Sequence, residues 1–471
     1  MSLEVFDTLT KEKRPFVPRE PGVVRMYNCG PTVYGRVHVG NLRSFLFADT
    51  LRRWLEVSGY EVRQVMNITD VGHLLDDAEE GEDKLEAQAR KEKKDPWEIS
   101  RHYTELFLKD VRALGCKEPL ARPKASEFVP EMLALIDGLM QKGFAYETHG
   151  NVYFEVARFP RYGRLSGNSV AELEAGARIE VRDEKRHPAD FALWKSDPKH
   201  LMKWASRFGP DGFPGWHIEC SAMARALLGD ELDLHTGGED NVFPHHECEI
   251  AQSEALTGKP FARYWMHAKF LQVDGGKMSK RLGNVWNLDD VLARGFSARV
   301  LRFALIRGHY RGPLNFTWGI LEEAKSALEK LDDLVARVRE ARAGTALGPR
   351  VGGEAVARAR ARFDAGMDDD LNVPQALAAL FELRAALLEG GAGREAAAEA
   401  WSFLERAQAA LGVLELEERK DARLEELVGR YAAARAQKDW ASSDRLRAEI
   451  KALGYTIMDT PQGPRTTFTG R

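Results

Sequence analysis

The segment VVRMYNCGPTVYGRVHVGNLRSFLFADTLRRWLEVSGYEVRQVMNI, Val23 to Ile68, decides the fold class. Residues 23–28 and 60–68 are short apolar runs typical of strands. Between them a helix is predicted to begin at Leu42 and to stop at Gly59, because apolar residues follow helical spacing at Leu42, Phe45, Leu46 and Leu55. Two strands joined through a helix pair in parallel by a right-handed crossover, so the sequence predicts an α/β fold.

Length and composition predict a multidomain protein without membrane-spanning segments. The 471 residues have room for several domains, and the formal net charge of -4 excludes a global basic field for nucleic acid. The start MSLEVFDTLTKEKRPF lacks an apolar signal region, and no long uncharged apolar run follows, so we expect a cytoplasmic protein. The four cysteines, Cys29, Cys116, Cys220 and Cys248, are too few for a disulfide framework and are expected to be reduced thiols or metal ligands.

Further along the chain the pattern changes twice. A helix at 131–142, a strand at 151–156 and a loop at 209–215 predict a mixed insertion between two halves of a sheet. The α/β pattern then resumes with a helix, a strand, a Gly-Gly turn and a helix at 217–228, 231–235, 237–238 and 245–256. From Thr317 onward, helical spacing predicts a bundle. The last residues, from about Asp421, predict a helical hairpin followed by a Gly/Pro-punctuated tail.

Two short motifs are suited to binding phosphate. His38 to Asn41, HVGN, precedes a helix whose N-terminus attracts anions, although an ordinary loop in which His38 caps the helix is the commoner meaning of so short a match. KMSKRLG, Lys277 to Gly283, puts two lysines on a Gly-flanked loop. These ammonium groups can meet the negative charge that develops on a phosphate in a transition state, and the alternative is a solvated basic turn.

A third constellation has the character of a metal site. Two thiols, an imidazole and a carboxylate make a plausible tetrahedral zinc set, here Cys29, Cys220, His245 and Glu249. His245 and Glu249 are at i and i+4, on one helix face, but such pairs are more often salt bridges. Because the ligands come from distant segments, spacing alone leaves open which member of HHECE, including His246 and Cys248, would point at the metal.

The motifs CGPTVY, HVGN, NITD, GWHIECSAMA, TGGEDNVFPHHECEIAQS and KMSKRLGN occur in that order, and together they resemble those of cysteinyl-tRNA synthetases, of the class I aminoacyl-tRNA synthetases. The resemblance runs essentially end to end and includes KDWASSDRLRAEIKALGY and DTPQG near the C-terminus. It implies a Rossmann-type catalytic domain in two halves, a connective insertion, a KMSKS and stem-contact region, a helical bundle for the anticodon arm and a small C-terminal anticodon-reading module. The two halves of the catalytic domain would be 1–115 and 216–270, with the connective insertion at 116–215. The KMSKS and stem-contact region would be 271–316, the helical bundle 317–415 and the anticodon-reading module 421–471.

The resemblance also implies the site residues. One Zn2+ per chain would be held by Cys29, Cys220, His245 and Glu249, which leaves His246 and Cys248 as neighbours. ATP, with Mg2+, would be bound by His38, Gly40, Asn41, Lys277 and Lys280, of which His38, Lys277 and Lys280 would be catalytic. L-Cysteine would be bound by Thr69, Trp216, His217 and Asp240. The candidates for anticodon contacts are Arg435, Trp440, Asp444 and Asp459.

From the residue types alone, other roles stay open for some of these positions. Trp216 could instead pack in the core, and Asp240 could instead cap a turn after two glycines. Trp440 could instead be the buried residue of a surface helix. The sequence departs from the family pattern at Asn41, where His is usual, at Arg281, where Ser is usual, and at GPRTTF in the tail, where many relatives have Trp.

The implied activity is ATP-dependent ligation of L-cysteine to tRNA(Cys) through a cysteinyl-adenylate, by a monomer. A simple pocket separates near-isosteres such as serine and cysteine by only about 100-fold, so zinc binding of the substrate thiolate is expected to do the selecting. Two alternatives are a cysteine ligase for a small amino-sugar acceptor, which would lack residues 421–471, and a non-catalytic zinc-containing RNA-binding homologue.

Overall fold

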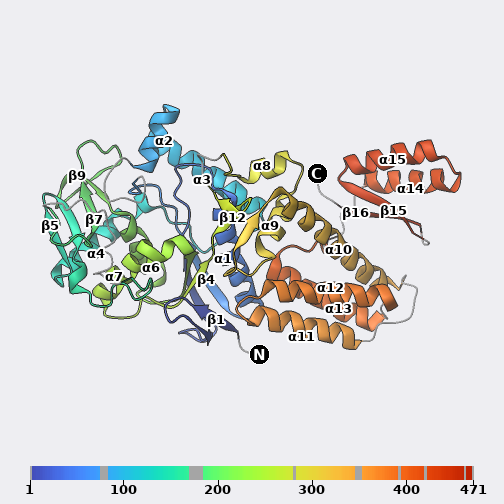
Figure 1. Ribbon diagram of the computed structural model, residues 1–471, viewed down its shortest axis with the longest axis horizontal. Helices are drawn as coiled ribbons and strands as arrows, with labels where there is room; N and C mark the ends of the chain where they lie inside the picture. The colour runs from blue at the N-terminus through green and yellow to red at the C-terminus, as the bar shows by residue number, and fades with distance from the viewer. Residues whose placement is uncertain are drawn as a thin grey trace.

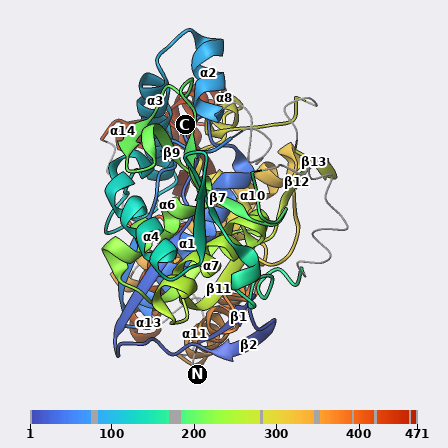
Figure 2. The same ribbon diagram turned by 90° about the vertical axis from the view of Figure 1, so that its left-hand side faces the viewer.

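A computed structural model describes residues 3–74, 83–168, 184–278, 283–344, 353–390, 394–417, 422–460 and 463–468. The molecule is elongated, with a mixed α/β region at one end, helices in the middle and a small C-terminal module at the other end (Figure 1). Figure 2 views the molecule from the end that carries the mixed region. None of the described helices combines the length and the apolar character needed to cross a bilayer.

The central sheet confirms the predicted α/β fold. Its strands lie in the order β11 (Ala262–Ala268), β10 (Leu232–Gly238), β3 (Val23–Asn28) and β4 (Glu61–Met66), and all pairs are parallel. The helices α1 (Val39–Val57), α6 (Trp216–Leu228) and α7 (Glu247–Thr257) connect them. The direction of chain order reverses between β3 and β10. Ligands of such open sheets bind outside the carboxyl ends of the strands at this switch point.

Helix α1 begins at Val39, three residues before the predicted start at Leu42. The reason is a capping box, in which His38 Nδ1 accepts from the Asn41 backbone N–H at 3.2 Å while Asn41 Oδ1 accepts from the His38 backbone N–H at 3.1 Å. The cap thus starts the helix before Leu42, the first residue of the predicted apolar pattern. The predicted face does pack inward, since Leu42, Leu46 and Leu55 are fully buried.

The mixed region between β4 and β10 contains α2 (Lys84–Glu92), α3 (Pro96–Ala113), α4 (Val129–Gln141), the 3-10 turns η2 (Ala125–Glu127) and η3 (Val156–Arg158), and an antiparallel sheet. The sheet has the order β5-β6-β7-β9-β8, and its strands are β5 (Ala145–Thr148), β6 (Asn151–Phe154), β7 (Phe191–Ser196), β9 (Gly209–Pro214) and β8 (Trp204–Ser206).

Two glycine-based predictions are wrong here. The predicted loop 209–215 is largely strand β9, and the predicted Gly237-Gly238 turn continues β10, paired with His267 and Ala268 of β11. In β9 the glycine serves packing, because a Cβ at Gly212 would lie 2.1 Å from the indole nitrogen of Trp194. Tertiary pairing therefore overrides the turn propensity of these residues.

The chain after β11 forms a small three-stranded sheet and then helices. The sheet order is β13 (Gly276–Lys277), β12 (Leu271–Val273), β14 (Leu314–Phe316), and α8 (Leu288–Ala293) and α9 (Ala298–Ile306) lie between its strands in sequence. The predicted bundle is present as α10 (Trp318–Ala343), α11 (Gly353–Asp368), α12 (Val373–Gly390) and α13 (Arg394–Leu411). Helix α1 packs against α9 and α13, and one hydrophobic core runs from α1 into the bundle.

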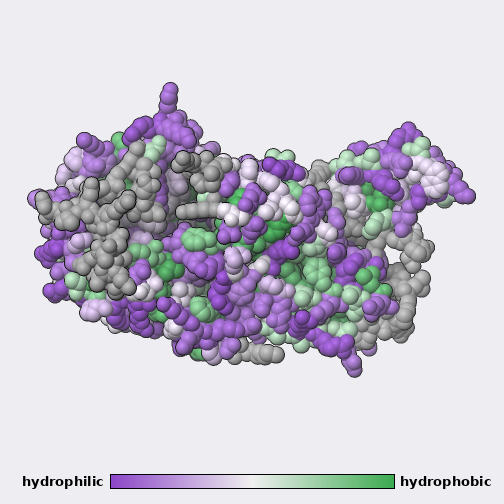
Figure 3. All heavy atoms as spheres, in the orientation of Figure 1, coloured by the Kyte–Doolittle hydropathy of each residue, from purple (hydrophilic) through white to green (hydrophobic). Residues whose placement is uncertain are grey.

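The C-terminal module consists of α14 (Ala422–Ala436), α15 (Trp440–Ala452), β15 (Tyr455–Thr460) and β16 (Gly463–Phe468). The predicted helical hairpin is confirmed, and the Gly/Pro-punctuated tail that follows it pairs as an antiparallel β-hairpin. The module has its own small core, which includes Leu427, Tyr431 and Ile450. It projects beyond the bundle and contacts α10 through β16 (Figure 1). Hydrophilic residues cover most of the face seen in Figure 3.

The remaining strands, β1 (Glu4–Asp7) and β2 (Glu12–Pro15), form an antiparallel hairpin beside β11. A 3-10 turn, η4 (Glu239–Asn241), and a π-helical turn, η5 (Val242–His246), join β10 to α7. The loop after β3 and the turns after β10 therefore both leave the central sheet at the switch point. This is the edge on which the candidate site is built.

Candidate active site

The four predicted metal ligands come together at the carboxyl edge of the sheet. Cys29 follows β3, Cys220 lies in α6, His245 in η5 and Glu249 in α7, and all four are buried. One ligand atom from each lies within 4.8 Å of every other. Cys29 Sγ is 3.9 Å from Cys220 Sγ and 3.7 Å from Glu249 Oε1, which lies 3.1 Å from His245 Nε2. None of the four cysteines is in a disulfide bond.

The chemistry of this donor set suits zinc. Two sulfurs, one nitrogen and one oxygen make a typical tetrahedral Zn2+ set, and residues from three separate segments of the chain supply them. Desolvation by burial raises the pKa of the Cys29 and Cys220 thiols, so thiolates at this position require a cation beside them. A divalent ion would supply that charge, and the residues present therefore fit the metal that the sequence implies.

Two more histidines enter the same cluster. His246 Nε2 lies 3.2 Å from Cys29 Sγ, and His235 Nε2 lies 2.8 Å from Glu249 Oε2. Together with Cys29 and Glu249 they form a second group of four possible ligands, which shares two residues with the first. Sequence reasoning treated His246 as a neighbour and missed His235. The available signal for His235 was a polar residue facing inward within the apolar strand β10.

Two of the predicted cysteine-binding residues contact the predicted metal ligand His245. The Trp216 ring stacks on that of His245, with centroids 4.5 Å apart, and His217 Nδ1 lies 3.0 Å from His245 Nδ1. Trp216 is half-buried at the start of α6, and Asp240 lies in η4, directly beyond the end of β10. The structure thus brings the amino-acid candidates and the metal candidates to one edge of the sheet.

Thr69 is held in a fixed orientation by polar neighbours. Its hydroxyl accepts from Asn67 Nδ2 at 3.1 Å and donates to Glu219 Oε2 at 2.9 Å. Glu219 is fully buried, its Oε1 has no hydrogen-bond partner among the described residues, and desolvation raises its pKa well above the usual value. Sequence reasoning missed Glu219, although it stands beside Cys220 in the HIEC motif.

The predicted ATP residues lie at the first turn of α1. His38 caps the helix, as the structural alternative expected, and this cap uses only the Nδ1 atom of its ring. A Cβ at Gly40 would lie 3.0 Å from Met278 Cε, so the glycine allows Met278 to approach the HVGN turn closely. The backbone of Lys277 ends β13, whereas Lys280 and Arg281 lie outside the described residues.

The anticodon candidates lie at the surface of the C-terminal module. Trp440 is 54% exposed, so the alternative of a buried tryptophan is wrong. The Arg435 guanidinium lies 4.6 Å from the Trp440 ring centroid and pairs with Asp459 at 2.5 Å. Asp444 pairs with Arg447 at 3.8 Å. An aromatic face, cations and carboxylates are therefore displayed side by side, a combination suited to splayed bases and phosphates.

Comparisons with known proteins agree with this geometry. The family model for the class I (C) catalytic domain of tRNA synthetases matches residues 15–326, and the DALR domain model matches residues 362–415. Among curated proteins, the chain is 44% identical to the cysteine–tRNA ligase of Chlorobaculum tepidum over 98% of both chains. It is 45% identical to that of a Thermus thermophilus strain over 99% of both chains.

Solved structures show the same fold at low identity. Mycobacterium tuberculosis methionyl-tRNA synthetase in complex with methionyl-adenylate superposes with a TM-score of 0.60 at 14% identity, covering 89% of this chain and 96% of the other. A leucyl enzyme of Agrobacterium radiobacter, in a ternary complex with tRNA, gives a TM-score of 0.62 at 12% identity, covering 84% and 85%. These likenesses support the Rossmann-type fold of the chain.

Proposed function

Because the chain belongs to the cysteine–tRNA ligase family of the class I aminoacyl-tRNA synthetases, we propose that it joins L-cysteine to tRNA(Cys), using ATP. The observation that carries this proposal is the buried Cys29, Cys220, His245 and Glu249 donor set, one loop away from the N-terminus of α1. This proximity supports the proposal of a thiol-selecting group and a phosphate-binding group at one edge of the sheet.

In the first step, a carboxylate oxygen of cysteine would attack the α-phosphorus of ATP. The new P–O bond forms as the bond to the β-phosphate oxygen breaks, which gives cysteinyl-adenylate and pyrophosphate. We assign His38, Gly40, Asn41 and the N-terminal N–H groups of α1 to phosphate binding, together with Lys277, Lys280 and Mg2+. Lys280 is the proposed contact to charge that grows in the transition state.

In the second step, a terminal ribose hydroxyl of the tRNA would attack the activated carbonyl, and AMP would leave. Selection precedes both steps. Cys29, Cys220, His245 and Glu249 would hold Zn2+, which when bound supplies a soft Lewis acid that favours a substrate thiolate over a serine hydroxyl. Trp216 and His217 would exclude water around the substrate side chain.

Thr69 and Asp240 would orient the ammonium group of cysteine. The Thr69 hydroxyl hydrogen is committed to Glu219, so its remaining lone pair can accept from the ammonium. The Asp240 carboxylate would add an ionic contact from the end of β10. Fixing one end of the amino acid in this way aligns its carboxylate with the phosphorus.

For tRNA, we propose that the surface formed by Arg435, Trp440, Asp444 and Asp459 contacts the anticodon, and that the bundle supports the anticodon arm. We assign residues 1–115 and 216–270 to the catalytic domain and 116–215 to the insertion. Residues 271–316 form the proposed stem-contact region, 317–415 the bundle and 421–471 the anticodon-reading module. We also propose that the protein acts as a monomer in the cytoplasm.

The test is attachment of radiolabelled cysteine to tRNA(Cys) by zinc-loaded, full-length protein with ATP. We expect charging with cysteine, none with serine, and cysteine-dependent exchange of pyrophosphate into ATP. Exchange without tRNA charging would favour a small amino-sugar acceptor, and absence of both would favour a non-catalytic RNA-binding homologue. X-ray absorption at the zinc edge, with and without cysteine, separates a substrate-binding metal from a structural one by the appearance of a new Zn–S contact.

A further inference from the structure

Arg43 is a buried arginine whose partners are all backbone carbonyls. It lies in α1, two residues beyond the HVGN turn, and only 3% of it is exposed. Nη1 donates to the carbonyls of Lys269 and Phe270, each at 3.0 Å. Nη2 donates to three carbonyls of a second loop, at distances of 3.2, 3.4 and 2.6 Å, those of His309, Tyr310 and Gly312.

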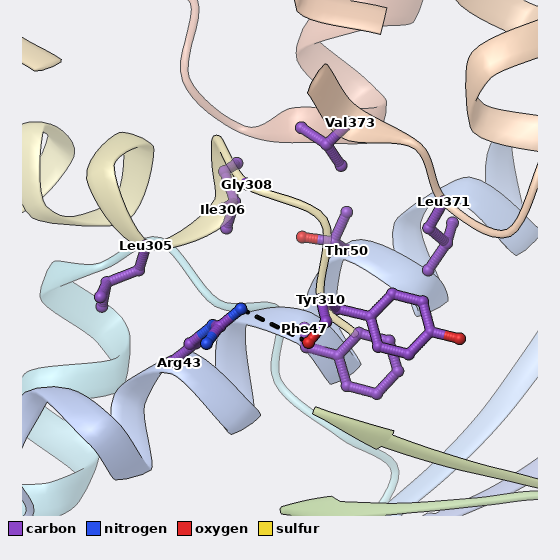
Figure 4. A pocket seen from close by; sticks show the side chains of 9 residues that line it. All are labelled: Arg43, Phe47, Thr50, Leu305, Ile306, Gly308, Tyr310, Leu371 and Val373. Carbon is purple, nitrogen blue, oxygen red and sulfur yellow. Dashed lines mark hydrogen bonds between the residues drawn. The ribbon is translucent and has the colours of Figure 1, made fainter. Parts of the chain in front are cut away.

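The surroundings of Arg43 leave it little freedom. Figure 4 shows the side chain reaching from α1 toward Tyr310, with Phe47, Leu305 and Gly308 around it. The cavity beside it measures about 20 Å3, room for a single water molecule. Desolvation lowers the pKa of Arg43 to about 10, so the guanidinium stays charged at neutral pH and depends on the carbonyl dipoles for its solvation.

The two loops that Arg43 holds lead into the small sheet that carries Lys277. Lys269 and Phe270 directly precede β12, which pairs antiparallel with β13 so that Gln272 is in register with Lys277. The loop 309–312 precedes β14, which pairs in parallel with β12. One side chain on α1 therefore fixes the entrances of β12 and β14, and β12 pairs directly with β13, which ends at Lys277.

We propose that Arg43 is a positioning residue for ATP, which sets the separation between the first turn of α1 and the β12–β13 hairpin. This inference rests on the proposed function, because both segments are assigned there to one nucleotide. Arg43 itself touches no substrate. A displacement of about 1 Å between groups that act on the same phosphates lowers the rate roughly 100-fold.

An arginine is required because the two loops are bonded through two different nitrogen atoms. The planar guanidinium carries five N–H donors in a fixed fork, whereas a lysine carries three donors on one nitrogen. The R43K substitution therefore keeps the charge but can hold only one loop well. It should loosen the hairpin relative to α1 while leaving the thiol pocket intact.

Arg302 on α9 provides a matched control. It is 1% exposed and donates to the carbonyls of Leu411 and Leu114 as well as to the carboxylate of Asp49. Its burial and its carbonyl partners resemble those of Arg43, but none of these partners belongs to the loops that enter β12 and β14. A merely structural role for buried arginine predicts similar consequences for R43K and R302K.

The experiment compares both variants with the unaltered, zinc-loaded, full-length protein. Tm is measured for each, together with kcat and KM for ATP in cysteine-dependent pyrophosphate exchange. Cysteine binding without ATP is followed by X-ray absorption at the zinc edge. For R43K we expect kcat/KM for ATP to fall about 100-fold with cysteine binding unchanged. For R302K we expect a lower Tm but kcat/KM for ATP within about threefold of the unaltered protein.

Wild-type exchange kinetics in R43K, or an equal loss in R302K, would overturn the inference. If R43K does not fold, R43Q is measured instead, because it leaves no unpaired charge. The same result is expected, a lower kcat/KM for ATP with unchanged cysteine binding. Failure of both to fold would count against a role specific to ATP. A lack of exchange in the unaltered protein would contradict the proposed function, whereas normal exchange with an unaffected R43K would contradict only this inference.

Discussion

The proposed metal-donor pocket and the proposed anticodon-reading surface of the C-terminal module are built from opposite kinds of surface. In the pocket, Cys29, Cys220 and Glu249 are buried, and the two cysteines stand 191 positions apart in the chain. In the module, Trp440 and Arg435 are displayed on a unit with its own small core. Changes in the pocket should therefore abolish amino-acid activation, whereas changes in the module should affect only the use of tRNA.

The largest effect is expected for Cys220→Ser. A serine oxygen is a harder and more reluctantly deprotonated ligand than a thiolate, so the variant should lose zinc and with it the preference for cysteine over serine. Cysteine-dependent pyrophosphate exchange should fall roughly 1,000-fold. Zinc content by elemental analysis and exchange rates check this. Cys116→Ser, outside the cluster, is the matched control, and a Cys220→Ser protein with full zinc content would contradict the assignment.

His38 offers the next test, on the ATP side of the pocket. Both His38→Ala and His38→Asn should lower pyrophosphate exchange roughly 100-fold, because both remove the imidazole from the phosphate site. Only His38→Ala should lose about 1 kcal/mol of unfolding free energy, since asparagine is itself a good N-cap. Denaturant unfolding and exchange kinetics separate the two roles. Exchange that is restored in His38→Asn would mean that His38 acts only as the helix cap.

The difference between the two regions also explains what the sequence could predict. Local periodicity predicts the β3–α1–β4 unit, and most of its strand ends lie within one residue of the predicted positions. The metal donors needed the family resemblance, because no spacing rule connects Cys29 to Cys220 or to Glu249. His235 and Glu219 were missed because the partners of a buried polar side chain lie in distant segments, which local patterns do not contain.

The loop predicted from the glycines at 209–215 was wrong for a related physical reason. Gly212 was interpreted as part of a loop, but its role is to make room for the Trp194 ring, a requirement set by a strand elsewhere in the insertion. In the C-terminal tail, the sequence pattern of Gly and Pro does not reveal that residues 455–460 and 463–468 pair as a hairpin. Gly and Pro thus predict where the chain turns more reliably than they predict the secondary structure on either side of the turn.

Trp440→Ala should give a smaller effect, confined to tRNA. Stacking of an aromatic ring on a base contributes about 1–3 kcal/mol, so KM for tRNA(Cys) should rise roughly 5- to 150-fold. Pyrophosphate exchange, which needs no tRNA, should be unchanged. Trp97→Ala, a partly exposed tryptophan of α3, is the matched control. A comparable loss of exchange in Trp440→Ala would show that the module and the pocket are not separable.

The smallest effect is expected for Asn41→His, which restores the residue that the family usually has. The Asn41 Oδ1 accepts from the His38 N–H, and its amide can still donate to a phosphate. A neutral imidazole also combines one acceptor with one donor, so KM for ATP should change less than about fivefold, with stability altered by less than about 1 kcal/mol.

The new histidine should nevertheless add a pH dependence that asparagine cannot have. An unperturbed imidazole titrates near pH 6.5, and its protonated form attracts phosphate more strongly. KM for ATP in Asn41→His should therefore rise between about pH 6 and pH 8 relative to that of the unaltered protein, as the imidazole loses its charge. If both proteins show the same profile, residue 41 acts through the capping box alone, and phosphate binding at this turn depends on His38 and the helix N-terminus.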